Sequence, residues 1–217
     1  MEEDRLRYLL VTDGTTDDAL LSPLTWLLRE SGVHRPIDSK WADLRQANPV
    51  PRSLAARIVA AVHYSRCDLL FIHRDAESQD PALRIKEIQQ ALYQAAQRCS
   101  LPPAINVIPV RMTEAWLLLN EDALRRAAGN PNGRIPLELP PLATLDRLAD
   151  PKTKMYELLR TASESSGRKR KKFSETESAR RVAELIEDFS PLRCLDAFHR
   201  LEEDIRQTVR EHGWVHT

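Results

Sequence analysis

Cysteine is scarce in this chain, and its scarcity excludes two classes of small protein. The three cysteines, Cys67, Cys99 and Cys194, are scattered, and none stands in the Cys-x-x-Cys spacing of a zinc knuckle. Their odd number also argues against a disulfide framework, which pairs its cysteines in secreted proteins. The sequence therefore predicts a protein of the reducing cytosol that needs neither disulfides nor a cysteine-bound zinc ion.

A net charge and a long apolar run are also missing. The 32 Lys and Arg residues balance 32 Asp and Glu residues, so the formal net charge is zero and no overall basic field attracts nucleic acid. A local basic patch could still do so. The N-terminus is acidic, and the apolar run after it is far too short for a signal sequence or a membrane span. We therefore expect a cytoplasmic protein without a membrane partner.

The chain does contain enough apolar material for a core, since 42% of its 217 residues are hydrophobic. As far as residue 128, short apolar runs that predict strands alternate with amphipathic runs that predict helices. The predicted strands are 8–12, 33–37, a run that ends near 73, and 104–110, and the predicted helices are about 20–28, 53–64, 81–98 and 112–128. This alternation implies a mostly parallel sheet flanked by helices, because parallel neighbours need crossover connections.

The composition changes after Gly133. Prolines 136, 140 and 141 predict an extended connector. The rest of the chain predicts helices at 142–149 and 151–162, and a last helical pair on either side of Ser190-Pro191. We therefore expect an α/β domain over residues 5–133 and a helical C-terminal extension over residues 134–217 that packs on or beside it.

The functional prediction centres on the stretch around His73. A buried strand ends near His73, and two acids, Asp75 and Glu77, follow it. Open α/β sheets place their functional residues outside the carboxyl ends of the strands. The next helix already has an N-cap and a first-turn proline in Asp80 and Pro81, so the two acids are not needed for capping. The alternative is a pair of solvated loop acids.

Two further acids follow other strands. Asp13 comes after the first predicted strand, and Glu114 comes after the fourth. In a parallel sheet both would meet Asp75 and Glu77 at one edge, where mutual repulsion favours a shared cation such as Mg²⁺ or Mn²⁺. Such an ion could activate water for attack on a phosphodiester. These four acids are the candidate metal ligands and catalytic residues.

Basic side chains near these acids are candidates for binding a phosphate group of the substrate. His73, Arg74 and Arg111 are close to the acids in the sequence, and guanidinium groups match phosphate geometry. Two of them have a structural alternative, since His73 could simply be hydrogen-bonded and Arg111 could pair with Glu114. The basic run 168–172 could follow a nucleic-acid backbone or form a solvated loop.

Two familiar motifs can be set aside. The segment Asp13–Thr16 could hold a phosphate at a helix N-terminus, but it lacks the Walker lysine and the full glycine pattern of an NTPase. Its threonines also suit helix capping. The segment His73–Asp75 superficially matches a kinase catalytic loop, but no asparagine follows at the required spacing and no glycine-rich loop precedes it. Neither an NTPase nor a kinase is expected.

Several segments resemble a bacterial family with a TOPRIM-like fold, related to the OLD-type (overcoming lysogenization defect) nucleases. They are Val11–Asp17 (VTDGTTD), Phe71–Glu77 (FIHRDAE) and Pro109–Leu118 (PVRMTEAWLL), and the similarity extends through Asp150–Lys152 (DPK) and Phe189–Arg193 (FSPLR). In the TOPRIM superfamily, an acid after the first strand and an Asp-x-Asp pair after a later strand handle divalent metals. Asp13 matches the first acid, and Asp75 and Glu77 match the pair.

The resemblance implies a TOPRIM-like α/β domain and a Mg²⁺- or Mn²⁺-dependent nuclease that acts on DNA or RNA. It further implies a bacterial phage-defence system with an ATPase partner. Glu114 is similar to the acid of the Glu-Ala-Trp segment of the family, and Lys152 joins the candidate substrate-binding residues. The chain has aspartate at position 13 where the superfamily usually has glutamate, and Glu77 where the second aspartate is usual. Because both changes alter reach, the alternative is a catalytically inactive TOPRIM-like subunit that binds nucleic acid or a partner protein. A homo-oligomer is compatible with either function.

Overall fold

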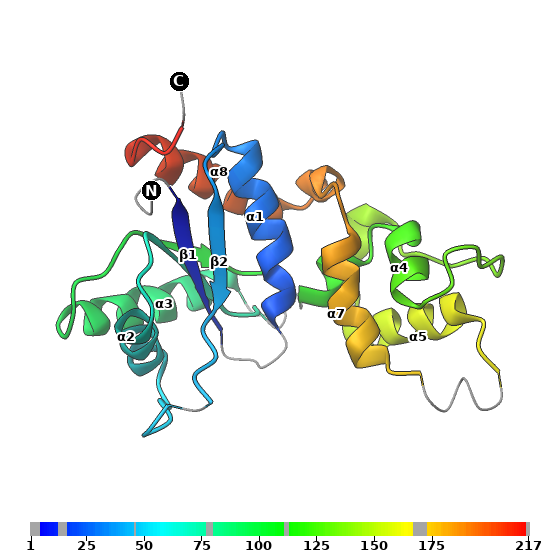
Figure 1. The fold of residues 1–217 in the computed structure, drawn as a ribbon, viewed down its shortest axis with the longest axis horizontal. Helices are drawn as coiled ribbons and strands as arrows, with labels where there is room; N and C mark the ends of the chain where they lie inside the picture. The colour runs from blue at the N-terminus through cyan, green and yellow to red at the C-terminus, as the bar shows by residue number, and fades with distance from the viewer. Residues whose placement is uncertain are drawn as a thin grey trace.

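A parallel sheet is the centre of the α/β part of the molecule. The computed structural model describes residues 5–12, 17–45, 47–76, 80–110, 113–166 and 173–215. Four strands form one sheet in the order β2-β1-β3-β4 (Figure 1). They are β1 Leu6–Val11, β2 Ile37–Trp41, β3 Leu69–His73 and β4 Ala104–Val107, and every neighbouring pair is parallel. The predicted α/β class, with a parallel sheet flanked by helices, is confirmed.

The winding direction of the sheet reverses between β1 and β3. The chain passes from β1 to β2 on one side and then crosses to β3 on the other side of β1. β1 and β3 pair directly, with Val11 opposite Ile72. In sheets of this kind a crevice forms outside the carboxyl ends of the two strands at the reversal point. Thr12 comes one residue after Val11, and Arg74 comes two residues after Ile72. Both therefore leave the sheet at the same edge.

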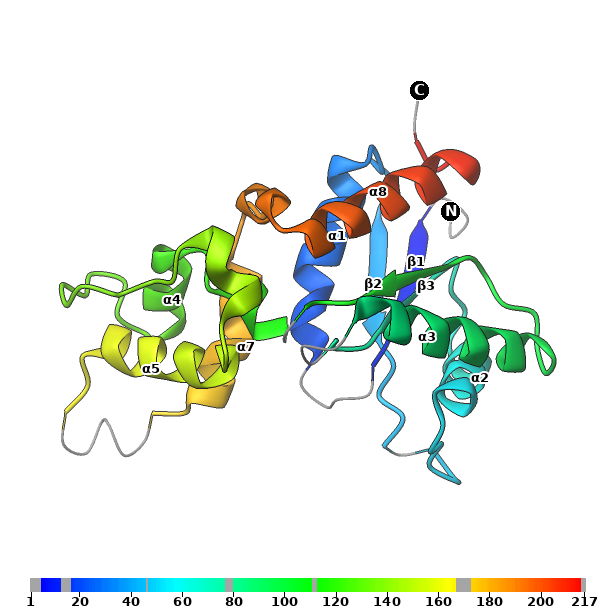
Figure 2. The same cartoon turned by 180° about the vertical axis from the view of Figure 1, so that it is seen from behind.

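Each face of the sheet is covered by two helices (Figure 2). The pairs are α1 (Leu21–Glu30) with α8 (Asp196–Glu211) on one face, and α2 (Leu54–Tyr64) with α3 (Pro81–Ala96) on the other. β3 is buried on both sides, because Leu69 and Phe71 pack in the first core whereas Leu70 and Ile72 pack in the second. Since α8 is the last helix, the C-terminal segment returns to complete the α/β core.

Two helices begin where acid-proline pairs predict them. α3 begins at Pro81, and the carboxylate of Asp80 accepts a hydrogen bond from the N–H of Ala82 at 2.9 Å. α5 (Pro151–Ser163) begins in the same way, with Asp150 as its cap at 2.9 Å from a backbone N–H. Proline at the first helical position has no N–H to satisfy. These starts are therefore set locally by the sequence.

A helical lobe lies beside the sheet (Figure 1). It consists of the 3-10 helix η2 (Thr113–Leu117) and the helices α4 (Glu121–Ala127), α5 and α7 (Glu175–Leu185). α4 packs against α5 and α7, so the lobe draws on residues from both sides of position 133. One continuous apolar core joins the lobe to the face of the sheet that α1 and α8 cover. The lobe and the sheet therefore share a core.

The remaining elements are short 3-10 helices, namely η1 (Asp17–Leu20), η3 (Leu142–Arg147) and η4 (Ser190–Cys194). η1 leads directly into α1, so Pro23 falls in the first turn of that helix, where a missing N–H breaks no hydrogen bond. Within the described ranges, no helix is long and apolar enough to cross a membrane.

The predicted second strand is displaced in the structure. It lies at 37–41 rather than 33–37. Nη1 of Arg29 donates to the carbonyl oxygens of Val33 and Arg35, both at 2.7 Å, which fixes these residues in the turn after α1. The observed strand lies at the edge of the sheet, and its three central residues are polar. The sequence therefore contains no apolar run that would predict a strand here.

The predicted helix at 112–128 is interrupted. η2 ends at Leu117, and α4 begins only after Asn120, whose side chain accepts a hydrogen bond from the N–H of Ala123 at 2.9 Å. An N-cap of this kind requires extended backbone, and Asn120 has φ −131° and ψ 109°. One continuous helix is therefore excluded.

Candidate functional site

His73 and Asp75 lie at the carboxyl end of β3. The N–H groups of Arg74 and Ala76 donate to carbonyl oxygens of β4 and the segment after it, at 3.1 and 3.0 Å. The chain therefore stays extended past the end of β3, and alternate side chains point to the same side. As a result, Nε2 of His73 lies 3.5 Å from Oδ1 of Asp75.

The position of the proton on one nitrogen of His73 follows from its surroundings. The His73 side chain is only 2% exposed, and its Nδ1 lies 3.0 Å from the carbonyl oxygen of Val107. Because a carbonyl oxygen can only accept, Nδ1 carries the proton and donates it. Nε2 is then the nitrogen that faces Asp75. The Asp75 side chain is 26% exposed, but its Oδ1, which faces the buried imidazole, is itself buried.

An arginine and a glutamate on α3 hold the segment around Asp75. Nε of Arg84 donates to the carbonyl oxygen of Asp75 at 3.1 Å, and Nη1 of Arg84 donates to Glu87 at 3.0 Å. Glu87 also accepts from Nη2 of Arg74 at 3.2 Å, so this predicted phosphate-binding residue is engaged by an acid. Sequence reasoning misses Arg84. Its one signal is its place on the buried stripe of α3, four residues before Ile88.

The end of β1 is held by two residues that sequence reasoning also misses. Thr12 is buried, and its hydroxyl accepts a hydrogen bond from Nε1 of Trp41 at 3.0 Å. Its carbonyl oxygen accepts from Nη1 of Arg57 at 2.8 Å. No local pattern predicts these contacts, because the partners lie 29 and 45 residues away in the chain. They fix the last described residue before position 13.

Asp13, Glu77 and Arg111, which the sequence predicts as site residues, lie outside the described residues. Asp13 directly follows Thr12 in the sequence, and Glu77 comes two residues after Asp75. The strands that precede them, β1 and β3, are neighbours in the sheet, with Val11 opposite Ile72. The meeting of Asp13, Asp75 and Glu77 stays a prediction.

Glu114 and Lys152 lie together where the sheet edge meets the helical lobe. Nζ of Lys152 is 3.9 Å from Oε1 of Glu114, whose side chain is 18% exposed. Glu114 belongs to η2, which packs against α5, the helix of Lys152, and against η1, the element that follows β1. The structure thus brings together two of the predicted residues, and it brings them together as an ion pair.

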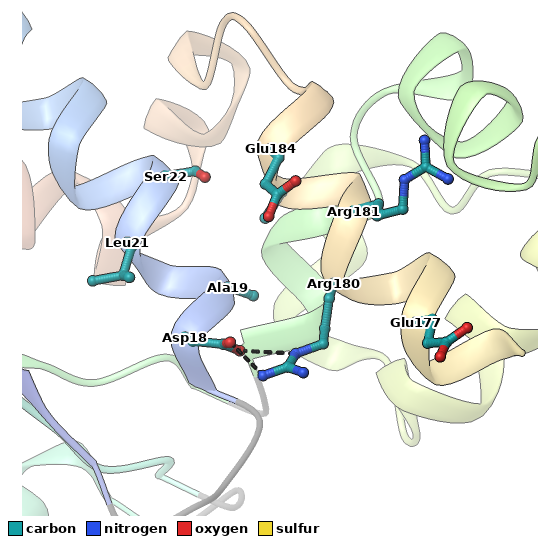
Figure 3. Close-up of a pocket in the computed structure, with 9 residues that line it drawn as sticks. Asp18, Ala19, Leu21, Ser22, Glu177, Arg180, Arg181 and Glu184 are labelled. Atoms are coloured by element: carbon teal, nitrogen blue, oxygen red, sulfur yellow. Dashed lines mark hydrogen bonds and ion pairs between the residues drawn. The ribbon is translucent and has the colours of Figure 1, made fainter. Parts of the chain in front are cut away.

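A charged cleft lies between α7 and the start of α1 (Figure 3). Its volume is roughly 590 Å³, and Arg180 of α7 reaches across to form an ion pair with Asp18 of η1. Glu177, Arg181 and Glu184 also line it. Because acids and arginines alternate around the cleft, it lacks the uniform basic field that a phosphate backbone favours. The ion pair ties the helical lobe to the sheet.

The structure describes two of the four acids in the predicted cluster. Asp75 and Glu114 are placed, and each has a different basic neighbour, His73 in one case and Lys152 in the other. Among the residues with described positions, no group of three or more His, Cys, Asp and Glu side chains could hold a metal ion. A metal site at this edge would therefore need ligands from the segments that contain Asp13 and Glu77.

Comparison of this chain with protein-family models, with curated proteins and with solved structures found no match. The relation to TOPRIM proteins that the motifs suggest therefore stays a prediction. The parallel sheet and the position of Asp75 at its carboxyl edge are seen directly.

Proposed function

We propose that this protein is a divalent-metal-dependent nuclease of the TOPRIM type that hydrolyses phosphodiester bonds of DNA or RNA. The observation that carries the proposal is the position of Asp75 beside the β1–β3 reversal point, with its side chain 26% exposed beside a buried histidine. Crevices at such reversal points are the usual binding sites of open α/β sheets. The motif resemblance adds an acid on the neighbouring strand end, Asp13, and a second acid after β3, Glu77.

The described residues fit one part of a metal site well. The backbone of Asp75 is anchored by Arg84 and by its extended pairing beside β4, so its carboxylate is held in place, with Oδ1 buried and the side chain 26% exposed. A fixed, accessible carboxylate oxygen is what Mg²⁺ and Mn²⁺ bind. In the proposed site Asp13, Asp75 and Glu77 hold the ion. Glu114 is the least suited of the four predicted acids, because Lys152 already neutralises it.

When bound, Mg²⁺ or Mn²⁺ would supply an activated water and would stabilise negative charge on the phosphate. The chain itself would bind and orient the substrate. Lys152 is 40% exposed and Arg74 is 24% exposed, so both could turn from their acidic partners, Glu114 and Glu87, toward a phosphate group. Arg111 would be a third such residue. These side chains would set the position of the backbone on the enzyme.

The motif resemblance also supplies a biological setting for the proposal. OLD-type nucleases act in phage defence together with ATPase activity, so we propose a cytoplasmic role in bacterial defence with an ATPase subunit as partner. Self-association is a further part of this proposal. A separate subunit would supply nucleic-acid affinity that a chain with zero net charge does not supply by its overall field.

The ion pair between Glu114 and Lys152 favours a second candidate function. A carboxylate that is neutralised by a lysine does not need a metal ion, and such a pair can hold a surface in shape for binding. In this case the chain is a catalytically inactive TOPRIM-like subunit that binds nucleic acid or a partner protein at the same edge.

Cleavage assays separate the two functions. Purified protein is incubated with single- and double-stranded DNA and RNA in the presence of Mg²⁺, Mn²⁺ or EDTA. The nuclease proposal expects cleavage that EDTA abolishes and that Asp75→Asn lowers about 100-fold or more, since losing a metal ligand costs at least as much as losing a residue behind it. Asp122→Asn, at an acid of α4 that is 67% exposed, is the matched control. Binding without cleavage under every metal would support the inactive subunit.

A further inference from the structure

A small pocket lies where the helical lobe meets the segment that follows β1. The 3-10 helix η1 forms one wall of this pocket, and η2, α5 and α7 of the lobe form the others. Its lining includes six residues with polar side chains, which are Thr113, Glu114, Lys152, Tyr156, Thr176 and Arg180. Because these side chains converge from four different elements, the pocket is a candidate binding site for a polar group.

Thr113 is the most buried of the polar residues that line the pocket. Only 5% of the residue is exposed, and its Oγ1 is buried without a hydrogen-bond partner among the described residues. A buried hydroxyl that lacks a partner destabilises a protein, and a bound ion or water molecule is a common explanation for such a group. A ligand in the pocket that accepts a hydrogen bond from Thr113 would supply the missing partner.

Two cationic side chains stand nearer the mouth of the pocket than Thr113, since Lys152 is 40% exposed and Arg180 is 50% exposed. Nζ of Lys152 is 3.9 Å from Oε1 of Glu114, which is beyond hydrogen-bond distance, so this ion pair does not use the N–H donors of the lysine. Arg180 donates to Asp18 from Nε and Nη2 (Figure 3), and that pair does not use Nη1. Both cations therefore have donors left for an anion.

The chemistry and the size of the pocket together favour one kind of ligand. Its hydroxyl, ammonium and guanidinium groups all donate hydrogen bonds, and two cations outnumber the single acid, Glu114, so the lining favours an anion with several acceptor oxygens. The volume is about 30 Å³. One water molecule needs about 10 to 15 Å³, whereas sites for whole small-molecule ligands start at about 300 Å³. The pocket therefore has room for one phosphate group but not for a nucleoside.

The same volume distinguishes a terminal phosphate from one inside a strand. A phosphate inside a strand carries a sugar on both sides, so it can touch only the mouth of so small a pocket. A terminal phosphate carries one sugar and can enter as far as Thr113, while the sugar stays outside.

We propose that this pocket binds the terminal phosphate of a phosphate monoester, with Thr113 as the donor at its base and Lys152 and Arg180 as the donors at its mouth. The inference rests on the proposed function, because it takes nucleic acid as the substrate and specifies strands that end in a phosphate. It does not depend on a metal ion. A free nucleotide carries the same group, and the experiment below separates the two sources.

Thr113→Val tests the base of the pocket. Valine has nearly the shape of threonine but no hydroxyl, so the variant loses a donor to the ligand and also loses an unsatisfied buried group. We expect it to bind a phosphorylated end about tenfold more weakly, with a melting temperature equal to or above that of wild type. A lower melting temperature with unchanged affinity would make the hydroxyl structural and overturn the proposal. Thr161→Val, at an exposed threonine of α5, is the matched control.

Two charge substitutions at the mouth should act in opposite directions. Lys152→Met should weaken binding of the phosphorylated end about tenfold or more, whereas Lys154→Met on the same helix should change it less than about twofold. Glu114→Gln should strengthen binding about threefold or more, because it removes a negative charge beside the phosphate and releases Lys152 from its ion pair. Weaker binding by a folded Glu114→Gln variant would overturn the proposal.

Fluorescence anisotropy in EDTA measures these affinities without any contribution from a bound metal ion. The ligand is an internally labelled single-stranded oligonucleotide, made as DNA and as RNA, with a 5′-phosphate, a 3′-phosphate or hydroxyl groups at both ends. One phosphorylated form should bind about tenfold or more tightly than the hydroxyl form, and Thr113→Val and Lys152→Met should lose this preference. Equal affinity of wild type for all three forms would overturn the proposal. Displacement by AMP at lower concentrations than by unlabelled oligonucleotide would identify a free nucleotide as the source of the phosphate.

These outcomes also separate this inference from the proposed function. Metal-dependent cleavage by a protein that binds phosphorylated and hydroxyl ends equally would keep the nuclease and remove the phosphate pocket. A preference for phosphorylated ends in a protein that cleaves no nucleic acid would keep the pocket and remove the nuclease.

Discussion

The carboxylates of Glu202 and Asp75 lie in two regions of the molecule and differ in their exposure and in the distance to their basic neighbours. Glu202 of α8 is 1% exposed, and it accepts hydrogen bonds from Arg193 at 2.6 Å and from Arg206 at 2.7 Å. Its carboxylate raises the pKa of Arg193, chiefly through these hydrogen bonds. Asp75 is 26% exposed, and its basic neighbour His73 stands farther away, at 3.5 Å.

If the proposed function is right, the difference separates a carboxylate that stabilises the fold from one that serves function. Glu202 is buried, and its hydrogen bonds to two arginines hold α8 against η4 and α1. No ligand can reach its carboxylate. Asp75 lies at a strand end, is 26% exposed and is held by its backbone, and in the proposed function it is the acid that binds a ligand. The predictions below test this division, beginning with the largest expected effect.

Removing the charge of Asp75 should abolish function and spare the fold. We expect Asp75→Asn to lower metal-dependent cleavage about 100-fold or more, with a change in midpoint of thermal unfolding of less than about 2 °C. The measurement is a cleavage time course with Mn²⁺ beside a melting curve by circular dichroism. A variant that cleaves at the wild-type rate would place the metal site elsewhere.

Removing the charge of Glu202 should do the reverse. Glu202→Gln removes the buried charge to which Arg193 and Arg206 donate, but both arginines are at least one third exposed, so we expect it to lower the free energy of unfolding by about 1 to 2 kcal/mol. Urea unfolding measures this change. Glu203→Gln, at the adjacent position and 61% exposed, should shift it by less than about 0.5 kcal/mol. Equal effects of the two substitutions would show that the Glu202 network does not hold α8.

The ion pair between Glu114 and Lys152 should behave as a surface pair in stability and as a phosphate contact in binding. Lys152→Met should change the free energy of unfolding by less than about 1 kcal/mol, because Lys152 is 40% exposed. It should also reduce the slope of log affinity against log salt by about 0.9 for double-stranded DNA. Fluorescence anisotropy at several salt concentrations measures the slope. Lys154→Met, on the same helix, should leave it unchanged, and a Lys152→Met slope equal to wild type would exclude the phosphate contact.

The smallest expected effect concerns the cap of α5. Hydrogen bonds from Thr153 lower the pKa of Asp150, so its stabilising contribution is present above the ordinary pKa of aspartate and disappears as pH falls through the lowered value. Asn is also a good N-cap but carries no charge. We therefore expect Asp150→Asn to melt slightly below wild type at pH 7, with the difference closing as pH falls below about 4. A difference that widens in acid would contradict the assignment of the lowered pKa.

Local signals predicted much of the fold. The apolar run before His73, and the acid-proline pairs at 80–81 and 150–151, each act within a few residues, so strand β3 and the starts of α3 and α5 lie where expected. The edge strand β2 was misplaced because its three central residues, Asp38, Ser39 and Lys40, are polar and leave no run of apolar side chains. Asn120 ended the predicted helix at 112–128 because side-chain capping competes with helix continuation.

The candidate site was predicted in part for the same reason. Asp75 could be found because it follows a recognisable strand, and the parallel class placed its edge correctly. Arg57, Trp41 and Arg84 could not be found, because each acts on a backbone or hydroxyl group of another element. The hydrogen bond from His73 to Val107 likewise spans 34 residues.

By itself, the sequence determined the class of the fold and the edge of the sheet at which Asp75 lies, since the apolar periodicity and the caps are set by neighbours along the chain. Only the tertiary structure decided which partner each charged side chain meets. Asp75 stands over His73, Glu114 pairs with Lys152, and Glu202 is enclosed by two arginines. Distances of 3 to 4 Å across strands and helices depend on register and packing, and these are properties of the whole core.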